Sequence, residues 1–328
     1  MKPSDRRLSV MLALIMAAYL VPHLARAAEG SFNRTLRVTG PVQLDVSTGS
    51  GAITVRPGNS SSLEVHGVIK ANNSWGLDSG NAEEKVRRLE SNPPIEQDGN
   101  FIRIGHIEDR DLRNNVSISY ELTVPPQTEI KCGTGSGNIE VEGVHGPAHA
   151  STGSGNISIS NLGDEVSAST GSGRIILGRV KGPVRATDGS GTIQASDIAG
   201  NFHLSTGSGD IQLSEISPGD GNVSTGSGNV KVTGVHGALR VGAGSGSISA
   251  QGHPTGGWVL HTGSGSLTVR IDPGASFDLD AHTDSGQIET QRSVTVQGTL
   301  RRGTLRGKVG SGGPLVNLRT GSGSIRID

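Results

Sequence analysis

Aliphatic residues recur at fixed places around a repeated Ser-Gly pair. They stand three and five places after the serine, as Ile157 and Ile159 do, and six and four places before the next serine, as Val166 and Ala168 do. A spacing of two within each group is the alternation of a β-strand that buries one face. A further aliphatic residue stands eight places after the serine, as at Leu162. Each repeat therefore predicts two short strands and a third apolar anchor.

The Ser-Gly pair repeats with a nearly constant step. From Ser136 to Ser264 the steps are 18 or 19 residues, and the later steps of 21, 26 and 11 indicate loop insertions and one incomplete turn. The copies begin at Ser50, Ser136, Ser154, Ser172, Ser190, Ser208, Ser227, Ser245, Ser264, Ser285, Ser311 and Ser322. Such a period is typical of a solenoid, in which each coil buries its apolar edge against its neighbours. The expected fold class is all-β: a single-stranded parallel β-solenoid (β-helix) of ~18-residue coils, right-handed because parallel crossovers default to that hand.

The pattern excludes two other repeat folds. No copy contains the Gly-Gly-x-Gly-x-Asp run that calcium-binding nonapeptide repeats require. Ile157, Leu162 and Val166 are spaced by five and four residues rather than by six, which argues against a hexapeptide helix.

A glycine-rich corner joins the two strands of each coil. The run Thr152-Gly153-Ser154-Gly155 is one copy of it. Glycine adopts positive φ without penalty, so a repeated corner requires it repeatedly. No histidine accompanies the serines at a fixed spacing, so a catalytic role for them is not expected.

The N-terminus carries an export signal. Residues 1–27 combine a basic start, an apolar run over 8–21 and small residues before the cleavage position, which we expect between Ala27 and Ala28. The apolar run is too short to span a bilayer comfortably, and no second long apolar run follows. We therefore expect an exported mature chain without a transmembrane segment.

The mature chain divides into two parts. Residues 28–130 are less regular and predict the first coils plus an insertion that caps the N-terminal end. Within them we expect a helix over 82–90 and strands over 101–104 and 116–124. Residues 131–328 predict the β-solenoid repeats.

Composition narrows the function classes. The chain has 51 glycines among 328 residues, a formal net charge of −1 and only 2% aromatic residues. Glycine does not recur at every third position, as it does in collagen. The scarcity of rings argues against a binder of single-stranded nucleic acid, so no nucleic-acid partner is expected.

Three groups of residues invite a chemical interpretation. Cys132, the only cysteine, falls on an inward column and predicts a buried spectator thiol. Asp197 and Glu215 would stack about 5 Å apart on successive coils, the separation of a retaining glycosidase. A surface pair between Arg179 and Asp197, beside a solvated Glu215, is the favoured interpretation.

Histidines raise the question of a metal site. His149 and His203 share one outward column but stand about 14 Å apart, too far to share an ion. His261 and His282 occupy equivalent positions on what the repeat predicts to be neighbouring coils. No third ligand is in sight, so we expect neither a metal nor another cofactor.

The outward positions suggest where a partner would bind. A flat polar column follows the corners and suits weak, repeated contacts. The region 292–328 holds seven basic residues against one acid, which suits anionic envelope polymers. The candidate binding surface comprises Asn138, Asn156, Arg174, Thr192, Asp210, Asn229, Arg301, Arg302 and Arg306.

The sequence resembles a known bacterial family. Residues 122–125 (Leu-Thr-Val-Pro), the run over 132–141 and the tandem Thr-Gly-Ser-Gly-x-Ile corners resemble exported β-strand-repeat proteins that are named adhesins, and residues 271–281 resemble a further stretch of that family. The resemblance covers nearly the whole mature chain. It implies a β-strand-repeat fold and an envelope-associated protein, and it brings no catalytic motif.

We therefore expect an exported, non-enzymatic β-solenoid that acts as an adhesin or as a cell-envelope binding or scaffold protein, periplasmic or at the cell surface. Its partner would be an envelope polymer or a surface protein. Two alternatives stay open. One is a self-assembling structural protein that associates end to end through the coil at Gly321–Asp328; the other is a polysaccharide-cleaving enzyme that uses Asp197 and Glu215.

Overall fold

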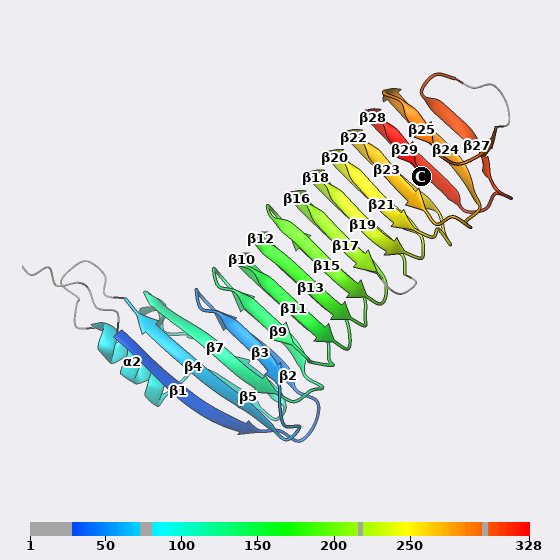
Figure 1. The fold of residues 1–328 in the computed structure, drawn as a ribbon. Coiled ribbons are helices and arrows are strands. Elements are labelled where there is room, and N and C mark those ends of the chain that lie inside the picture. Colours follow the sequence, from blue (N-terminus) through cyan, green and yellow to red (C-terminus); the bar gives the residue numbers. More distant parts are fainter. Residues whose placement is uncertain (1–27, 73–80, 216–218, 297–300) are drawn as a thin grey trace, which may run out of the picture.

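The computed structural model describes residues 28–72, 81–215, 219–296 and 301–328, and it shows an elongated all-β molecule (Figure 1). Two long sheets face each other, and the chain passes alternately through one and the other. The prediction of an all-β, solenoid-like fold is confirmed. The signal peptide predicted over 1–27 lies outside the described residues, and Ala28 is the first residue of the first strand.

In the described part of the chain, sheet A contains 14 strands and sheet B contains 15. Across sheet A the order is β1 (Ala28–Arg37), β4 (Ser62–Ala71), β7 (Val116–Val124), β3 (Ile53–Pro57), β9 (Ile139–Glu142), β11 (Ile157–Leu162), β13 (Arg174–Val180), β15 (Thr192–Ile198), β17 (Ile211–Glu215), β19 (Val230–Val235), β21 (Ile248–Gly252), β23 (Leu267–Ile271), β29 (Ile325–Ile327) and β25 (Ile288–Thr290). Across sheet B it is β5 (Ile95–Asp98), β6 (Phe101–Ile104), β2 (Gln43–Thr48), β8 (Glu129–Thr134), β10 (Ala148–Ser154), β12 (Val166–Ser172), β14 (Val184–Asp188), β16 (Phe202–Ser208), β18 (Gly221–Ser227), β20 (Leu239–Ser245), β22 (Trp258–Ser264), β28 (Leu315–Ser322), β24 (Phe277–Ser285), β27 (Thr304–Val309) and β26 (Val294–Val296).

Successive coils pair in parallel, and like positions of the repeat stack on one another. In sheet B, Ala148 pairs with Val166 and Val166 with Val184. In sheet A, Ile157 pairs with Ile175. The inward positions predicted from the alternation are buried and form one continuous core between the sheets.

The core holds a few aromatic rings. Trp258 is fully buried between Leu239 and Val316, and its Nε1–H donates to the carbonyl of Gly237 at 3.0 Å. Gly221 pairs with Phe202 in the next strand, and a Cβ on Gly221 would lie 2.0 Å from the Phe202 ring. The missing side chain at 221 therefore makes room for the ring at 202.

A threonine hydroxyl ties most corners to the neighbouring coil; Asp188 and Ala243 take the place of the threonine in two of them. Thr152 Oγ1 donates to the carbonyl of Gly137 at 3.1 Å, and Thr170 Oγ1 donates to the carbonyl of Gly155 at 3.1 Å. The same bond is made by Thr134, Thr206, Thr225, Thr262, Thr283 and Thr320. These hydroxyls are buried and supply donors to carbonyls at the bend, where an unpaired polar group would be costly.

The glycine after the corner serine is required by space as well as by conformation. A Cβ on Gly155 would lie 2.0 Å from the carbonyl oxygen of Gly137, and one on Gly173 would lie 2.0 Å from that of Gly155. Gly246 adds a backbone φ of +132°, which L side chains rarely adopt. Close stacking of corners therefore explains why glycine recurs at this place in coil after coil.

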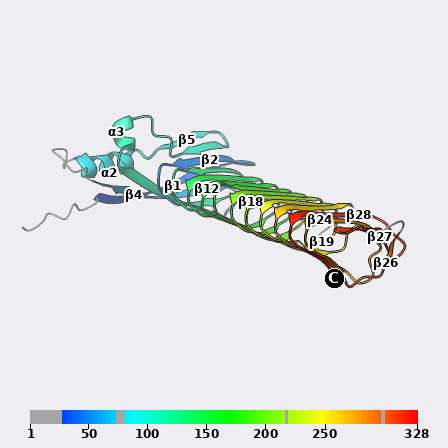
Figure 2. The same cartoon turned by 90° about the horizontal axis from the view of Figure 1, so that it is seen from above.

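An antiparallel unit with helices lies at the N-terminal end (Figure 2). The expected helix is present as α2 (Asn81–Ser91), the expected strands are β6 and β7, and a short helix, α3 (Arg110–Arg113), precedes β7. Helix α2 packs against β1 and β4. The Glu90 Oε1 on α2 accepts a bond from the Ser31 N–H of the edge strand β1 at 2.9 Å, so the helix partly blocks that edge.

The sequence predicted that the coil at Gly321–Asp328 forms the exposed C-terminal end of the solenoid. This prediction is wrong, because other strands flank the coil on both sides. β28 pairs with β22 on one side and β24 on the other, and β29 pairs with β23 and β25. In this position both edges of β28 and β29 find partners, whereas an end position would satisfy one edge. The antiparallel strands β24, β27 and β26 close sheet B instead. Ser311 lies in the turn before β28 rather than at a corner.

Two glycines of β20 and its corner provide a matched test of corner stacking. Gly246→Ala places a Cβ 1.9 Å from the carbonyl oxygen of Gly228, so we expect it to lower the free energy of unfolding by about 2 kcal/mol or more. Gly242→Ala is the control, because nothing lies within 4 Å of its Cβ position. Its effect should stay within about 0.5 kcal/mol in the same urea titration. Equal effects of the two substitutions would contradict the stacking constraint.

Candidate functional site

The polar column that was predicted as a binding surface also has a structural role, because its side chains bond to the backbone of the neighbouring coil. The side-chain oxygen of Asn138 accepts a bond from the Asn156 N–H at 2.9 Å, and that of Asn156 accepts one from the Arg174 N–H at 2.9 Å. Asp210 and Asn229 repeat the pattern in the later coils, onto the N–H groups of Asn229 and Ser247. These side chains therefore cap the backbone of the next coil, which leaves only part of their bonding capacity for a partner.

Arg174 and Thr192 complete this column. The Arg174 Nε donates to Thr192 Oγ1 at 3.3 Å, and the arginine is exposed. The column is thus a line of polar groups that are bonded to one another along the solenoid axis.

The basic residues near the C-terminal end do not form one cluster. Arg306 is paired with Asp280 at 2.9 Å, and Arg326 with Asp328 at 3.0 Å. Arg301 and Arg302 are exposed at the turn that precedes β27. Of the three arginines proposed there as binding residues, Arg306 is already neutralised by an internal partner.

Asp197, one of the two carboxylates considered for catalysis, lies on a structural bend. Arg179 and Asp197 adopt positive φ values of 52° and 57°, as does Asn161 at 58°. Arg179 donates to the side-chain oxygen of Asn161, and it forms no ion pair with Asp197, contrary to the surface pair predicted from the sequence. The side chain of Glu215 lies outside the described residues, so its distance to Asp197 stays a prediction.

The histidines are placed differently from the prediction. β28 lies between β22 and β24, so His261 and His282 both pair with Arg319 and are not on neighbouring strands. The insertion of β28 is the reason. His236 and His253 instead lie close, with ring centroids 6.5 Å apart, and His253 Nδ1 is 3.8 Å from an Asp272 carboxylate oxygen. Among the described residues, no group of three metal-ligating side chains gathers.

Cys132 is a buried thiol, as predicted. Its side chain is 1% exposed, and burial, helped by the charge of Asp45, raises the pKa of the thiol far above its usual range. A protonated, inaccessible sulfur has no nucleophilic role.

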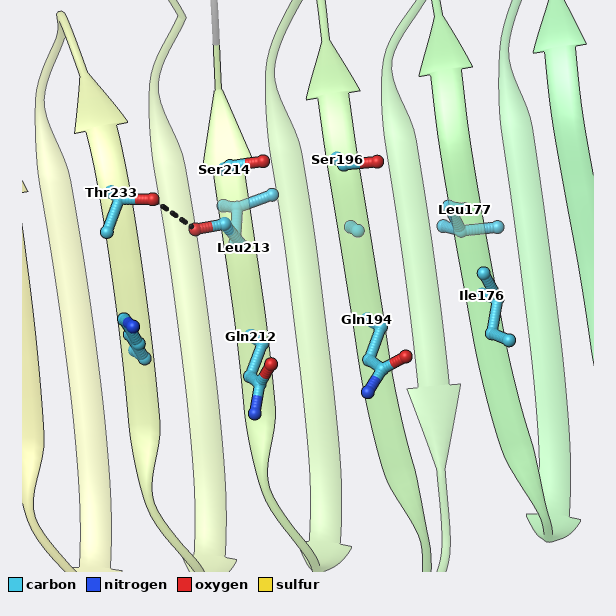
Figure 3. Close-up of a pocket in the computed structure, with 10 residues that line it drawn as sticks. Ile176, Leu177, Gln194, Ser196, Gln212, Leu213, Ser214 and Thr233 are labelled. Carbon is cyan, nitrogen blue, oxygen red and sulfur yellow. Dashed lines mark hydrogen bonds between the residues drawn. The ribbon is translucent and has the colours of Figure 1, made fainter.

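The outer face of sheet A carries a shallow trough of about 380 Å³ (Figure 3). One wall holds long side chains: Ile176, Gln194, Gln212 and Lys231. The floor and the other side hold Ser196, Ser214 and Thr233. The trough crosses β13, β15, β17 and β19, so each coil contributes the same pair of positions to it. Such a surface offers amide and hydroxyl groups to an elongated neutral ligand.

A match to a family profile identifies the family to which the chain belongs. The profile of the family described as Toastrack DUF4097 matches residues 42–328. The chain belongs to the Toastrack family. This confirms the resemblance to the β-strand-repeat family found in the sequence. No curated protein matches the Toastrack chain significantly.

Two solved structures are similar to this Toastrack chain. A candidate cell adhesion protein from Clostridium sporogenes is 13% identical, with 92% of this chain and 99% of that one covered, at a TM-score of 0.26. A candidate adhesin from Bacteroides fragilis is 11% identical, with 91% of this chain and 97% of that one covered, at a TM-score of 0.28. Among the described helices of the Toastrack chain, none has the length and apolar content needed to cross a membrane.

The sequence analysis missed the trough of sheet A. Its signal was present in the repeat alignment, where long side chains stand four places after the corner serine and short ones stand six places after it. Each outward position looks ordinary by itself, and the contrast between long and short side chains emerges only when the two outward columns are compared over several coils.

One buried acid interrupts the threonine ladder of the Toastrack chain. Asp188 takes the place of the corner threonine, and its residue is 2% exposed. Its Oδ1 accepts a bond from the Ser190 N–H at 3.0 Å, while Oδ2 has no hydrogen-bond partner among the described residues. A carboxylate cannot donate to the carbonyl of Gly173 as a threonine would, but a protonated carboxyl group can. Burial raises the pKa of Asp188 above its ordinary range.

The stability of the chain should fall as pH rises through the raised pKa of Asp188. A raised pKa means that the folded state binds the Asp188 carboxyl proton more tightly than the unfolded state does. The contribution of this proton to the free energy of unfolding is therefore complete in acid and is lost as pH rises toward neutral. Asp188→Thr restores the hydroxyl donor and should give a thermal midpoint above that of the parent, with a gap that widens from acid to neutral pH. Asp188→Asn is the non-titrating control. Parallel pH profiles of parent and Asp188→Thr would refute the role of this proton.

Proposed function

We propose that this Toastrack protein is an exported, non-enzymatic adhesin: an envelope-associated binding or scaffold protein whose partner is a cell-envelope polymer or a surface protein. The observation that carries the proposal is the repeating outer surface of the solenoid, of which the trough of sheet A is the clearest part. One pair of positions recurs in successive coils, so a polymer with its own repeat meets equivalent contacts along the axis.

Several sequence features belong to the same proposal. They are the export signal over 1–27, the N-terminal unit over 28–130 and right-handed coils of ~18 residues over 131–328. A rigid array of coils suits a protein that must hold many weak contacts in register. Rigidity limits the ordering cost of binding, because the side chains are already spaced by the strands.

Co-sedimentation of the purified protein with whole cell-envelope fractions tests the proposed function. We expect the protein to pellet with the envelope at low salt. Binding that persists at high salt would support uncharged contacts such as those in the trough, and binding lost at high salt would support an electrostatic contact. If the protein pellets with the envelope at neither salt concentration, the proposed adhesin function is refuted.

A separate assay tests the non-enzymatic part of the proposal. Neither the parent nor a variant with Asp197→Asn and Glu215→Gln should release reducing ends from a panel of envelope polysaccharides. Asp197 stands at a left-handed bend of the repeat, where its backbone conformation has a structural cause. Cleavage by the parent that is absent in the variant would establish an enzyme instead.

A further inference from the structure

The outer face of sheet B carries basic side chains and no acidic ones over most of its length. The chain has 29 lysines and arginines and 30 acids, so its overall charge is nearly balanced. The outward positions of β10, β12, β14, β16, β18, β20, β22 and β28, all of them described, hold no acidic residue. They hold His149, Arg185, His203, Arg240, His261 and Arg319, and we call this outer surface of sheet B the basic face.

Three arginines of the basic face lack a carboxylate partner. Arg185, Arg240 and Arg319 are exposed, and none of them forms an ion pair with a described residue. Arg319 donates only to the amide oxygen of Asn317, at 3.1 Å. Arg56 and Arg306, by contrast, are paired with carboxylates at 3.2 and 2.9 Å. Exposed guanidinium groups without a carboxylate partner are available to an external anion.

Ion pairs mark both limits of the basic face. Lys131 on β8 pairs with Asp45 at 3.3 Å, and Arg306 pairs with Asp280 on β24 at 2.9 Å. The nearest acids along its side, such as Glu165 and Asp220, lie in the turns that precede the strands. Asp220 uses one carboxylate oxygen to accept a bond from the Ala238 N–H at 3.0 Å. Carboxylates thus lie at the ends and along the side of the basic face, and none lies on its outward strand positions.

The surface beside the arginines is flat and rich in hydroxyl groups. The outward column two places further along the strands carries Ser151, Ser169, Thr187, Ser205 and Ser224, followed by Gly242, His261 and Arg319. A hollow of about 250 Å³ lies next to Arg240 and is also lined by Asn222, Val259 and Asp220, whose Oδ1 already accepts the Ala238 N–H. Val259 is 36% exposed, so the hollow offers an apolar patch beside an amide and a guanidinium. That combination suits a sugar ring with a carboxylate substituent.

The spacing of the arginines indicates the charge density of the ligand. Arg185 on β14 and Arg240 on β20 share one column and are three strand spacings apart, about 14 Å. Arg319 on β28 lies two spacings, about 10 Å, further along the axis and two residues, about 7 Å, across it, in the neighbouring column. Duplex DNA carries one charge for about every 1.7 Å of its axis, far denser than this array. A polysaccharide with a carboxylate on each sugar, or on every few sugars, is less dense in charge than DNA and can place one carboxylate at each arginine.

We propose that the basic face binds a linear, carboxylate-bearing polysaccharide, laid along the solenoid axis with its uronate groups on Arg185, Arg240 and Arg319. The inference rests on the proposed adhesin function and names its partner class. Hydroxyls of the serine column contact the sugar hydroxyls between the charged positions, and the hollow beside Arg240 receives one acidic sugar ring.

Binding of polygalacturonate to the purified protein tests this proposal, with dextran as the neutral probe. Replacement of the three arginines by glutamine should weaken polygalacturonate binding at low salt by about tenfold or more, because three charge-assisted contacts are removed together. The matched control is Arg37→Gln with Arg110→Gln and Arg113→Gln, which removes the same charge from exposed positions of the N-terminal unit. It should keep binding within about twofold of the parent. Circular dichroism and thermal midpoints verify that both variants are folded.

Four outcomes overturn the proposal: no binding of polygalacturonate by the parent, equal loss in both triple variants, equally tight binding of dextran, or tighter binding of duplex DNA. Parallel envelope co-sedimentation separates this inference from the proposed function. Envelope binding without polygalacturonate binding overturns the inference alone. Arginine-dependent polygalacturonate binding without envelope binding overturns the adhesin function and leaves the acidic-polysaccharide surface standing.

Discussion

Every coil of this protein depends on the contact between one corner and the next. The glycine after the corner serine lies so close to the carbonyl of its neighbour that a Cβ does not fit, and a threonine hydroxyl donates to that same row of carbonyls. Sequence variation is therefore tolerated at outward positions but hardly at the bend. Asp188 shows the cost of an exception, because its buried second oxygen has no donor.

The regular part of the fold could be predicted because its information is local and repeated. Alternation around each corner identified inward residues such as Ile157 and Val166, and the structure buries both. The position of β28 could not be predicted in this way. Its strand order depends on which edges pair most fully in three dimensions, and the alternation within 315–322 is the same for an internal and a terminal coil.

The candidate site was predicted less well than the fold. Asn138 and Asn156 were chosen because they are polar and face outward, but their oxygens cap backbone N–H groups of the next coil, which a sequence pattern does not reveal. The arginines of the basic face were visible in the repeat alignment. Their significance arises only from what surrounds them, because an arginine next to a carboxylate and one without a partner look alike in sequence.

The internal position of β28 and β29 has a consequence for how the chain reaches its native state. From β8 and β9 to β23, coils can be added one after another as the polypeptide emerges, since each strand docks on a strand of an earlier coil. β24 and β25 cannot take their final places until residues 315–327 are available to lie beneath them. The last coils therefore form out of chain order, because β28 and β29 must pair between strands that precede them in the sequence. Once paired, β28 and β29 have a neighbouring strand on both edges and do not fray from the end of the sheet.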